Sequence, residues 1–351
     1  MLPKKEMVYS KKKELYGLNS DNYDNNQEFL DELKNAKNLL AFSSGTDSTA
    51  LYFSLKEYEI SFDIAIVDYG TRRQSKLEVS RAKSLCFWDN KKCYTLTTKP
   101  IAKNFEAEAR KIRYDFFYTL TLQESYQNLI LAHQLNDNFE WFLMQFCKGS
   151  SIENMQIPKK SLFWEESQRK CHILRPMISI SKNQIKSYLQ KRNIFYFEDS
   201  SNLDIAFTRN YFRQNFANPL IENFTKGIHF SLENLAKQIP LDNLKDLGGY
   251  FIFKSSPLDL YKIDKATKKL GYCLSQAQKK ECQLKLTQDC FSIVFGGKIA
   301  LEKSQNNLFI FPYTSCTLTK TQKELFRKHK IPKKFRFFMA KNSLALSIIP
   351  Q

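Results

Sequence analysis

Apolar and polar positions alternate in blocks along the first half of the chain, and the clearest block covers residues 38–54. A short apolar run there breaks into the polar stretch Ser43–Ser48 and then resumes with helical spacing. This order predicts a buried strand, a tight turn and the first turn of a helix. Apolar runs at Phe62–Val67, Cys93–Leu96 and Asn128–Ala132 are separated by helical patterns, which predicts a parallel sheet covered by helices.

The remainder of the chain shows helical patterns and then β-rich ones. Helices are expected at Glu28–Lys37, at Ser181–Arg192, at Thr208–Asn215 and near residues 219–245. Between Gly149 and about Cys171 the sequence is polar and irregular, so we expect no regular element there. Short β-rich runs follow at Tyr250–Lys254, Cys290–Phe295 and Asn307–Phe311. They predict a second, smaller α+β domain after Gly248.

These patterns divide the chain into four parts. The parts are an N-terminal extension (1–35), an α/β domain with a Rossmann-like parallel sheet (36–217), a helical connector (218–247) and a smaller α+β domain (248–351). A chain of 351 residues with 42% hydrophobic content can bury a core in each of two domains.

The charge of the chain is strongly positive and unevenly distributed. Its 54 Lys and Arg against 36 Asp and Glu give a formal charge of +18. Residues 241–351 alone hold 20 Lys and Arg against 8 Asp and Glu. Such an excess favours a polyanionic partner, and the many Phe and Tyr residues suit RNA, whose unpaired bases stack on aromatic rings. A solvated basic surface that only aids solubility is the alternative.

The eight cysteines form no C-x-x-C pair and no zinc-finger spacing, so the sequence does not support metal or iron–sulfur ligation by cysteine. No signal-peptide pattern opens the chain, and no apolar run approaches the length of a membrane span. We therefore expect a reducing, cytoplasmic setting without a membrane partner. The sequence leaves the oligomeric state open.

The turn Ser43–Ser48 directs backbone N–H groups, hydroxyls and a helix N-terminus at one small volume, which suits an anion such as a phosphate chain. It matches neither the Walker loop nor G-x-G-x-x-G. An ordinary serine-rich turn is the alternative. Asp68 and His133 follow the second and fourth predicted strands, and the carboxyl ends of parallel strands are where such sheets bind ligands.

A second group of candidates begins at His133. If a helix starts just after it, then His133, Asp137 and Glu140 share one face. The buried side would hold Phe139, Phe142, Leu143 and Phe146. One imidazole and two carboxylates could bind magnesium, hold an amine or accept protons. The alternative is a capped amphipathic helix with a solvated acidic stripe.

Two basic clusters accompany these groups. Arg110 and Arg113 lie one helical turn apart, and Arg209, Asn210 and Arg213 lie together near the start of another predicted helix. Paired guanidinium groups can clamp a phosphate or the edge of a base. Helix surfaces with ordinary ion pairs are the alternative for both clusters.

In their order and spacing these segments resemble the motif series of the tRNA(Ile)-lysidine synthetases, a family of PP-loop ATP pyrophosphatases with the marker S-G-G-x-D-S. The motifs are SSGTDS (43–48), VDYGTR (67–72), EAEARKIRY (106–114), AHQLNDNFEW (132–141) with KG (148–149), LRP (174–176), and EDSSN (198–202) with TRNYFR (208–213). The series covers residues 38–216. Its EDSSN and R-N-x-x-R elements separate it from NAD synthetases, GMP synthetases and tRNA thiolases.

The chain departs from the family pattern at several positions. Ser44 stands for the first glycine, Tyr69 for a histidine, Gln134 and Asn136 for a histidine and an aspartate, Trp141 for a threonine, and Lys148 for an arginine. We expect the loop to tolerate Ser44, because serine adopts most turn conformations except those with positive φ. The second carboxylate of many relatives is absent at Asn136.

The resemblance implies a PP-loop ATPase domain and a ligase. The enzyme would use ATP and Mg²⁺ to join free L-lysine to C2 of the wobble cytidine (position 34) in tRNA(Ile) with a CAU anticodon. An adenylated cytidine would be the intermediate, and the lysidine product would convert the tRNA from methionine to isoleucine specificity. The basic C-terminal domain would bind the tRNA, and neither a membrane nor DNA would take part. There are two alternatives. The chain could be another PP-loop tRNA-modifying enzyme of the thiolase kind, or a catalytically degenerate relative that binds tRNA.

The resemblance also implies roles for single residues. Ser43, Ser44, Gly45, Thr46, Asp47 and Ser48 would hold the ATP pyrophosphate, Asp47 would bind Mg²⁺, and Asp68 would contact the nucleotide. Asp137 and Glu140 would recognise lysine, and His133 would lie near the phosphates or the reacting base. Arg110 and Arg113 would take part in catalysis and, with Arg209, would clamp the nucleotide or the flipped cytidine. Arg209, Asn210 and Arg213 would contact the cytidine or the tRNA.

Overall fold

The computed structural model describes residues 23–70, 73–99, 101, 104–150, 152–166, 169–198, 208–238, 244–304 and 306–345. Its contacts divide the chain into two units, Met1–Ile239 and Pro240–Gln351, which are treated separately below. Most of the predicted N-terminal extension and of the EDSSN loop, residues 199–202, lies outside the described residues. No described helix is long and apolar enough to cross a membrane.

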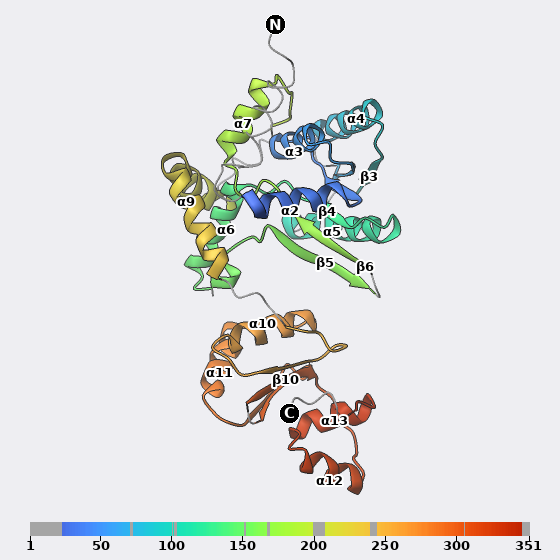
Figure 1. The fold of residues 1–351 in the computed structure, drawn as a ribbon, viewed down its shortest axis with the longest axis vertical. Helices are drawn as coiled ribbons and strands as arrows, with labels where there is room; N and C mark the ends of the chain where they lie inside the picture. Colours follow the sequence, from blue (N-terminus) through green and yellow to red (C-terminus); the bar gives the residue numbers. More distant parts are fainter. Residues whose placement is uncertain are drawn as a thin grey trace. The chain divides into compact units, whose positions relative to one another are not determined.

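The first unit is a layered α/β fold (Figure 1). Its helices are α2 (Tyr23–Lys34), α3 (Thr46–Glu57), α4 (Arg73–Trp88), α5 (Phe105–Gln123), α6 (Leu135–Cys147), the 3-10 turn η1 (Ile152–Asn154), α7 (Lys182–Lys191), α8 (Thr208–Phe212), the π-helical segment η3 (Arg213–Ala217) and α9 (Asn218–Gln238). Its strands are β1 (Asn38–Ala41), β2 (Phe62–Asp68), β3 (Cys93–Thr97), β4 (Asn128–Ile130), β5 (Lys160–Glu166) and β6 (Arg169–Leu174).

The six strands form one sheet in the order β3-β2-β1-β4-β6-β5. All neighbours are parallel except β5, which pairs antiparallel with β6. The four strands predicted from apolar runs are confirmed as β1 to β4, and the Rossmann-like α/β class is confirmed with them. Because β1 and β4 are central, the turns that follow them meet at the same edge of the sheet.

The expectation of an irregular stretch between Gly149 and Cys171 is wrong, because β5 and the first half of β6 lie there. These two strands form the edge of the sheet, and β5 exposes most of its side chains. Trp164 is the exception, since it is buried and donates from Nε1 to Thr121 Oγ1 at 2.8 Å. A strand with one buried side chain carries little apolar signal in its sequence.

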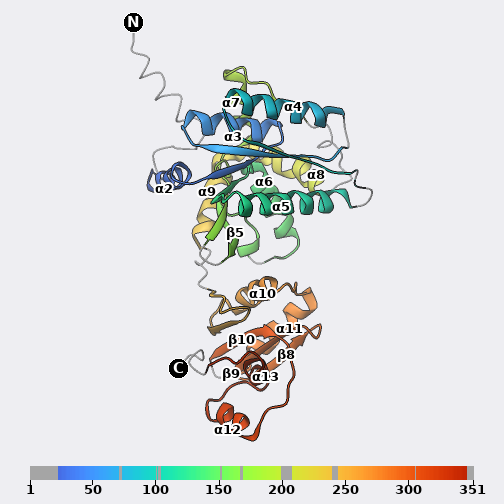
Figure 2. The same cartoon turned by 90° about the vertical axis from the view of Figure 1, so that its right-hand side faces the viewer.

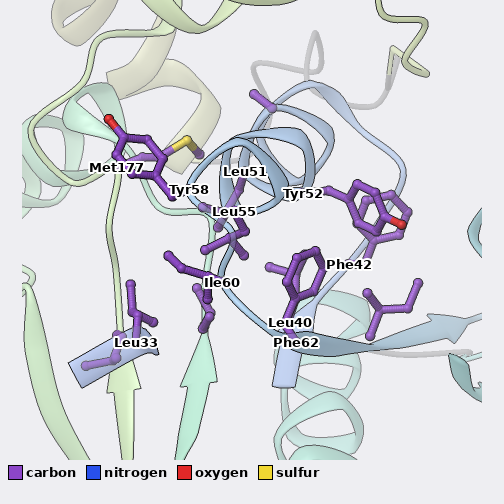
Figure 3. Packing of buried hydrophobic residues seen from close by; sticks show 14 of the residues in the cluster. Leu33, Leu40, Phe42, Leu51, Tyr52, Leu55, Tyr58, Ile60, Phe62 and Met177 are labelled. Carbon is purple, nitrogen blue, oxygen red and sulfur yellow. The ribbon is translucent and has the colours of Figure 1, made fainter. Parts of the chain in front are cut away.

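Helices cover both faces of this sheet (Figure 2). Helices α3, α4 and α7 lie on one face, where they pack with α2 in a core that includes Leu40, Leu51 and Phe62 (Figure 3). Helix α5 lies on the other face, with Leu39 and Phe117 in that core. Leu39 and Leu40 face opposite ways because side chains alternate along a strand. This packing fixes the ends of β1 and β4 relative to α3 and α6.

Helix α9 packs against α6 through a smaller core of Leu135, Phe139, Ala217, Ile221 and Leu232. It therefore belongs to the first unit by its contacts, although the sequence suggested a connector at 218–247; the four-part division as a whole stays a prediction. The expected buried side of α6 is wrong at Phe146, which is 61% exposed.

The second unit is an α+β fold, as the sequence predicted. Its elements are β7 (Phe251–Lys254), α10 (Asp259–Lys269), α11 (Gln276–Leu286), β8 (Phe291–Phe295), β9 (Ile299–Ser304), β10 (Asn307–Pro312), α12 (Lys320–Lys328) and α13 (Lys333–Lys341). The antiparallel sheet has the order β7-β10-β9-β8. One core joins it to α10 and α11, and another joins it to α12 and α13.

Candidate active site

A cavity of about 330 Å³ lies at the carboxyl ends of β1, β2 and β4. The turn Ser43–Ser48 forms one side of it, apart from Ser44, and Tyr69 and Arg113 form another. His133 and Lys182 complete its polar lining. The structure thus brings the predicted anion-binding turn together with one predicted arginine and the predicted histidine.

The turn has the features of an anion site. Helix α3 begins at Thr46, and its N-cap residue Gly45 has no side chain that could cap the first N–H groups of the helix. The first N–H groups of a helix lack intrahelical acceptors and lie at the positive end of the helix dipole. The Ser43 and Ser48 hydroxyls lie 3.0 Å apart beside them. An oxyanion in the cavity would therefore meet donors from both the backbone and side chains.

Ser44 differs from what the sequence suggested. Its φ is +58°, so this position does adopt the left-handed conformation that we expected the loop to avoid. A side chain there costs about 1–2 kcal/mol relative to the right-handed region. The Ser44 hydroxyl is buried and donates to the carbonyl oxygen of Glu78 in α4 at 2.8 Å, and the Ser44 carbonyl accepts from the Phe197 N–H at 3.1 Å. Ser44 therefore anchors the turn with its side chain directed away from the cavity.

Asp47 faces the cavity in contact with a lysine that the sequence analysis did not single out. Lys182, the first residue of α7, donates from Nζ to Asp47 Oδ1 at 2.7 Å. Burial raises the pKa of the Asp47 carboxyl, and the Lys182 ammonium opposes that shift. The signal that could have found Lys182 is its place just after the LRP motif, directly behind the helix-capping residue Ser181.

His133 is neutral near pH 7. Burial lowers its pKa to about 4, and the guanidinium of Arg175 acts in the same direction. Arg175 Nε lies 3.3 Å from His133 Nδ1. Since arginine only donates, Nδ1 accepts and the ring proton lies on Nε2. His133 can thus offer a neutral N–H donor to a ligand in the cavity.

Asp137, Glu140, Arg209 and Arg213 form a compact group, the carboxylate–arginine cluster. Arg213 Nε lies 2.6 Å from Glu140 Oε2, and Arg213 Nη2 lies 3.2 Å from Asp137 Oδ1. Arg209 donates from Nε to Glu140 Oε1, and its Nη2 lies 3.6 Å from Asp137 Oδ1. The sequence analysis singled out all four residues, but it assigned them to separate ligands and did not predict that they pair.

The charges of this cluster depend on one another. The Glu140 side chain is 1% exposed, and this burial raises its pKa while Arg209 and Arg213 oppose the shift. Burial lowers the pKa of Arg209, but Glu140 and Asp137 outweigh it and the net pKa lies above the ordinary value. A cationic ligand would have to replace a guanidinium at Glu140, whereas Asp137 is 13% exposed and more accessible.

Three predicted site residues lie outside these two groups. Arg110 donates to the Tyr114 hydroxyl at 3.2 Å and does not line the cavity. The Asp68 carboxylate accepts from the Gly70 N–H at 2.8 Å and caps its own turn. Asn210 lies beside Arg209 on α8, half-buried. Their predicted roles stay predictions.

Two departures from the family pattern hold the site together. Gln134 caps α6 through its side chain, and Asp137 accepts from the Gln134 N–H at 3.2 Å. Asn136 Oδ1 accepts from the Lys182 N–H at 3.0 Å, and its Nδ2 donates to Asn218 Oδ1 at 2.8 Å. An amide at position 136 thus joins α6 to the starts of both α7 and α9. An aspartate could not donate the second of these bonds.

We predict that two substitutions of Ser44 separate two contributions to stability, the cost of its positive φ and the gain from its buried hydrogen bond to Glu78. Ser44→Ala keeps a Cβ at positive φ and loses the bond, so unfolding free energy should fall by about 1–2 kcal/mol in urea titrations. Ser44→Gly relieves the conformation and should be about 1 kcal/mol more stable than the alanine variant. Ser125, exposed at φ +57°, is the matched control for the backbone effect. A glycine variant no more stable than alanine at position 44 would contradict this account.

His133 should make the fold sensitive to acid. Its folded pKa of about 4 lies below the ordinary 6.5, so the unfolded chain takes up the proton first. Unfolding free energy should therefore fall as pH drops from about 6.5 to about 4. His133→Asn should lose part of this dependence in urea titrations at several pH values. A pH-independent difference between the two proteins would show that His133 is not held neutral.

Comparison with known proteins supports one assignment. The family model of the PP-loop domain matches residues 18–220. The tRNA(Ile)-lysidine synthase of Campylobacter jejuni strain RM1221 is 39% identical over 325 residues, which cover 91% of this chain and 97% of the relative. The tRNA(Ile)-lysidine synthase of Helicobacter pylori strain J99 is 39% identical, over 88% of this chain and 90% of the relative.

A solved structure of similar fold is the U34-tRNA thiolase NcsA from Methanococcus maripaludis. It is 17% identical, with a TM-score of 0.51, over 69% of this chain and 82% of that one. At this identity the likeness concerns the fold alone. The family resemblance seen in the motifs is confirmed by the relatives, and the chain belongs to the PP-loop domain family and, within it, to the tRNA(Ile)-lysidine synthases.

Proposed function

We propose that this ligase uses ATP to join L-lysine to C2 of the wobble cytidine in tRNA(Ile) with a CAU anticodon. The observation that carries the proposal is the pairing of two sites in a chain of this family. One is a cavity with an anion-binding turn, and the other is the carboxylate–arginine cluster at the start of α6. A cytoplasmic location goes with the tRNA substrate and is part of the proposal.

The first half-reaction uses the cavity. The C2 oxygen of cytidine attacks the α-phosphate of ATP, an O–P bond forms, and pyrophosphate leaves. The turn Ser43–Ser48 and the N-terminus of α3 hold the pyrophosphate, and Arg113 lies in the wall of the same cavity. His133 offers its Nε2 proton to a phosphate or base oxygen. Phosphoryl transfer of this kind depends on positioning and on charge neutralisation, which these groups supply.

The second half-reaction uses the carboxylate–arginine cluster. The lysine ε-amine attacks C2, a C–N bond forms, and AMP leaves with the former C2 oxygen. Free lysine is protonated near pH 7, so a nearby group must accept a proton before attack. Asp137 is the more accessible carboxylate, and Glu140 becomes available when Arg209 or Arg213 moves to another anion such as a phosphate. The cluster thus offers both a carboxylate for the amine and a guanidinium for the nucleotide.

Mg²⁺ fits this site only together with ATP. Asp47 is the one carboxylate among the described residues that line the cavity, and these residues contain no group of three His, Cys, Asp or Glu that could hold a metal. Mg²⁺ is commonly held by one or two carboxylates plus substrate phosphates, so Asp47 would hold it. Bound there, the ion would neutralise phosphate charge. The same lack of a cysteine–histidine group gives no support to a cluster-dependent thiolase.

The second unit offers a surface for the tRNA. Residues 320–341, the basic hairpin, contain nine Lys and Arg against one acidic residue, Glu324. Seven of the nine are exposed and form no ion pair within the part of the chain that the structure describes: Lys320, Lys323, Arg327, Lys328, Lys330, Lys333 and Lys341. Phosphate contacts of this kind position a nucleic acid without reading its sequence.

Nucleoside analysis tests the proposed function. The full chain is incubated with ATP, radiolabelled lysine and an isoleucine tRNA transcript with a CAU anticodon, and the tRNA is then digested. Labelled lysidine, with one AMP and one pyrophosphate released per lysine, is the expected product. A transcript with cytidine 34 replaced by uridine is the control. Label-free tRNA would overturn the proposal, and ATP cleavage without lysine incorporation would favour another PP-loop activity.

The basic hairpin should contribute to tRNA affinity in a salt-dependent way. The double substitution Lys323→Gln with Lys330→Gln should weaken tRNA binding and reduce the slope of log K against log salt by about 1–2, because each phosphate contact adds roughly one unit. Filter binding at several salt concentrations measures this. Lys76→Gln with Lys83→Gln, two exposed lysines on α4, is the control of equal charge. An unchanged slope in the hairpin variant would show that these lysines do not contact tRNA phosphates.

A further inference from the structure

We propose that Lys182 is a phosphate-binding residue of the ATP site, held by Asp47 in the ATP-free protein and transferred to the β- or γ-phosphate when ATP binds. This inference rests on the proposed function, because it takes ATP as the ligand of the cavity. It adds a residue from α7 to a site otherwise built from α3, α5, the ends of β1 and β2, the segment between β4 and α6, and Phe197.

The position of Lys182 is determined by its backbone rather than by its ion pair. Ser181 caps α7 in a reciprocal arrangement with Gln184. The Lys182 N–H donates to Asn136 Oδ1 at 3.0 Å, and the Leu135 N–H donates to Ile180 O at 2.9 Å. The start of α7 is therefore tied to the start of α6 at Lys182 itself and two residues before it. Its side chain remains directed at the cavity whichever partner it holds.

The ion pair with Asp47 faces the cavity and is readily exchanged. The Lys182 side chain is 30% exposed and that of Asp47 is 27% exposed, and both line the cavity. Solvent that reaches both partners weakens the pair, so its exchange for another anion costs little. A triphosphate offers an ammonium more negative charge than one carboxylate does. When Lys182 moves to the phosphate, its ion pair with Asp47 is broken and the Asp47 carboxylate becomes available to another cation.

The neighbourhood of Asp47 explains why the chain needs a cation there. Asp137 and Asp47 repel one another enough to raise the Asp47 pKa, after the larger effect of burial. Without Lys182, a triphosphate bound at the N-terminus of α3 would add its charge beside these two carboxylates. The positive charge of Lys182 offsets the repulsion between the phosphates and these carboxylates. Its flexible side chain carries a compact ammonium group that suits phosphate oxygens.

The experiment measures ATP and AMP binding to the full chain by calorimetry, without tRNA or lysine and with EDTA present. Lys182→Met should weaken ATP binding about tenfold, equal to 1.4 kcal/mol, and leave AMP binding unchanged. Lys182→Arg should bind ATP within about threefold of wild type. Lys186→Met is the matched control, because Lys186 lies one turn along α7 in an exposed pair with Glu198 at 3.8 Å. Thermal unfolding checks that each variant is folded. If Lys182→Met is not folded, Lys182→Gln replaces it in the measurement.

A double variant separates direct binding from simple neutralisation of Asp47. The double variant Asp47→Asn with Lys182→Met is compared with Asp47→Asn alone. If Lys182 contacts phosphate, it still binds ATP about tenfold more weakly than Asp47→Asn. If Lys182 only offsets the charge of Asp47, the two bind ATP equally, which overturns the proposal. ATP binding unchanged in Lys182→Met overturns it too. These outcomes do not depend on lysidine formation, so failure of the proposed function would be seen separately.

Discussion

The contact between Glu140 and the two arginines of the carboxylate–arginine cluster is the constraint on which the site depends. Glu140 is buried on α6, and a buried carboxylate requires charged partners or neutralisation. Arg209 and Arg213 provide them from α8 and η3, about seventy residues further along the chain. This contact joins α6, which follows the central strand β4, to the helices that continue into α9. The cluster also places two guanidinium groups and two carboxylates near the cavity, where their opposite charges compensate one another.

The cavity beside α3 contains an ion pair of the same kind on a smaller scale. Asp47 is paired with Lys182, and His133 is kept neutral by burial beside Arg175. Asp47 and Lys182 thus lie in contact as oppositely charged groups, whereas His133 places no second positive charge beside Arg175. Substrates with opposite charges, a triphosphate and an amine, can each take one partner of such a pair.

Some of this could be predicted from the sequence, for identifiable reasons. Strands β1, β2 and β4 are buried on both faces, so their apolar runs are continuous and were recognised. Strand β3 lies at the edge of the sheet without a fully buried residue, and it was recognised from its short β-rich run. Strand β5 buries mainly Trp164 and was missed. Asp137 and Arg213 were each singled out, but their pairing joins distant segments and depends on the path of η3 between them. The positive φ of Ser44 could not be predicted, because its hydrogen bond to Glu78 is a tertiary contact that offsets a local preference.

The central claim is that the cavity and the cluster serve different half-reactions, and single-turnover kinetics of Glu140→Gln test it most directly. ATP labelled at the α-phosphate is mixed with enzyme and tRNA, and adenylated tRNA is measured before and after lysine is added. The account predicts adenylation within about threefold of wild type and lysine transfer slower by at least about tenfold. Equal losses in both steps, or no loss in either, would contradict it.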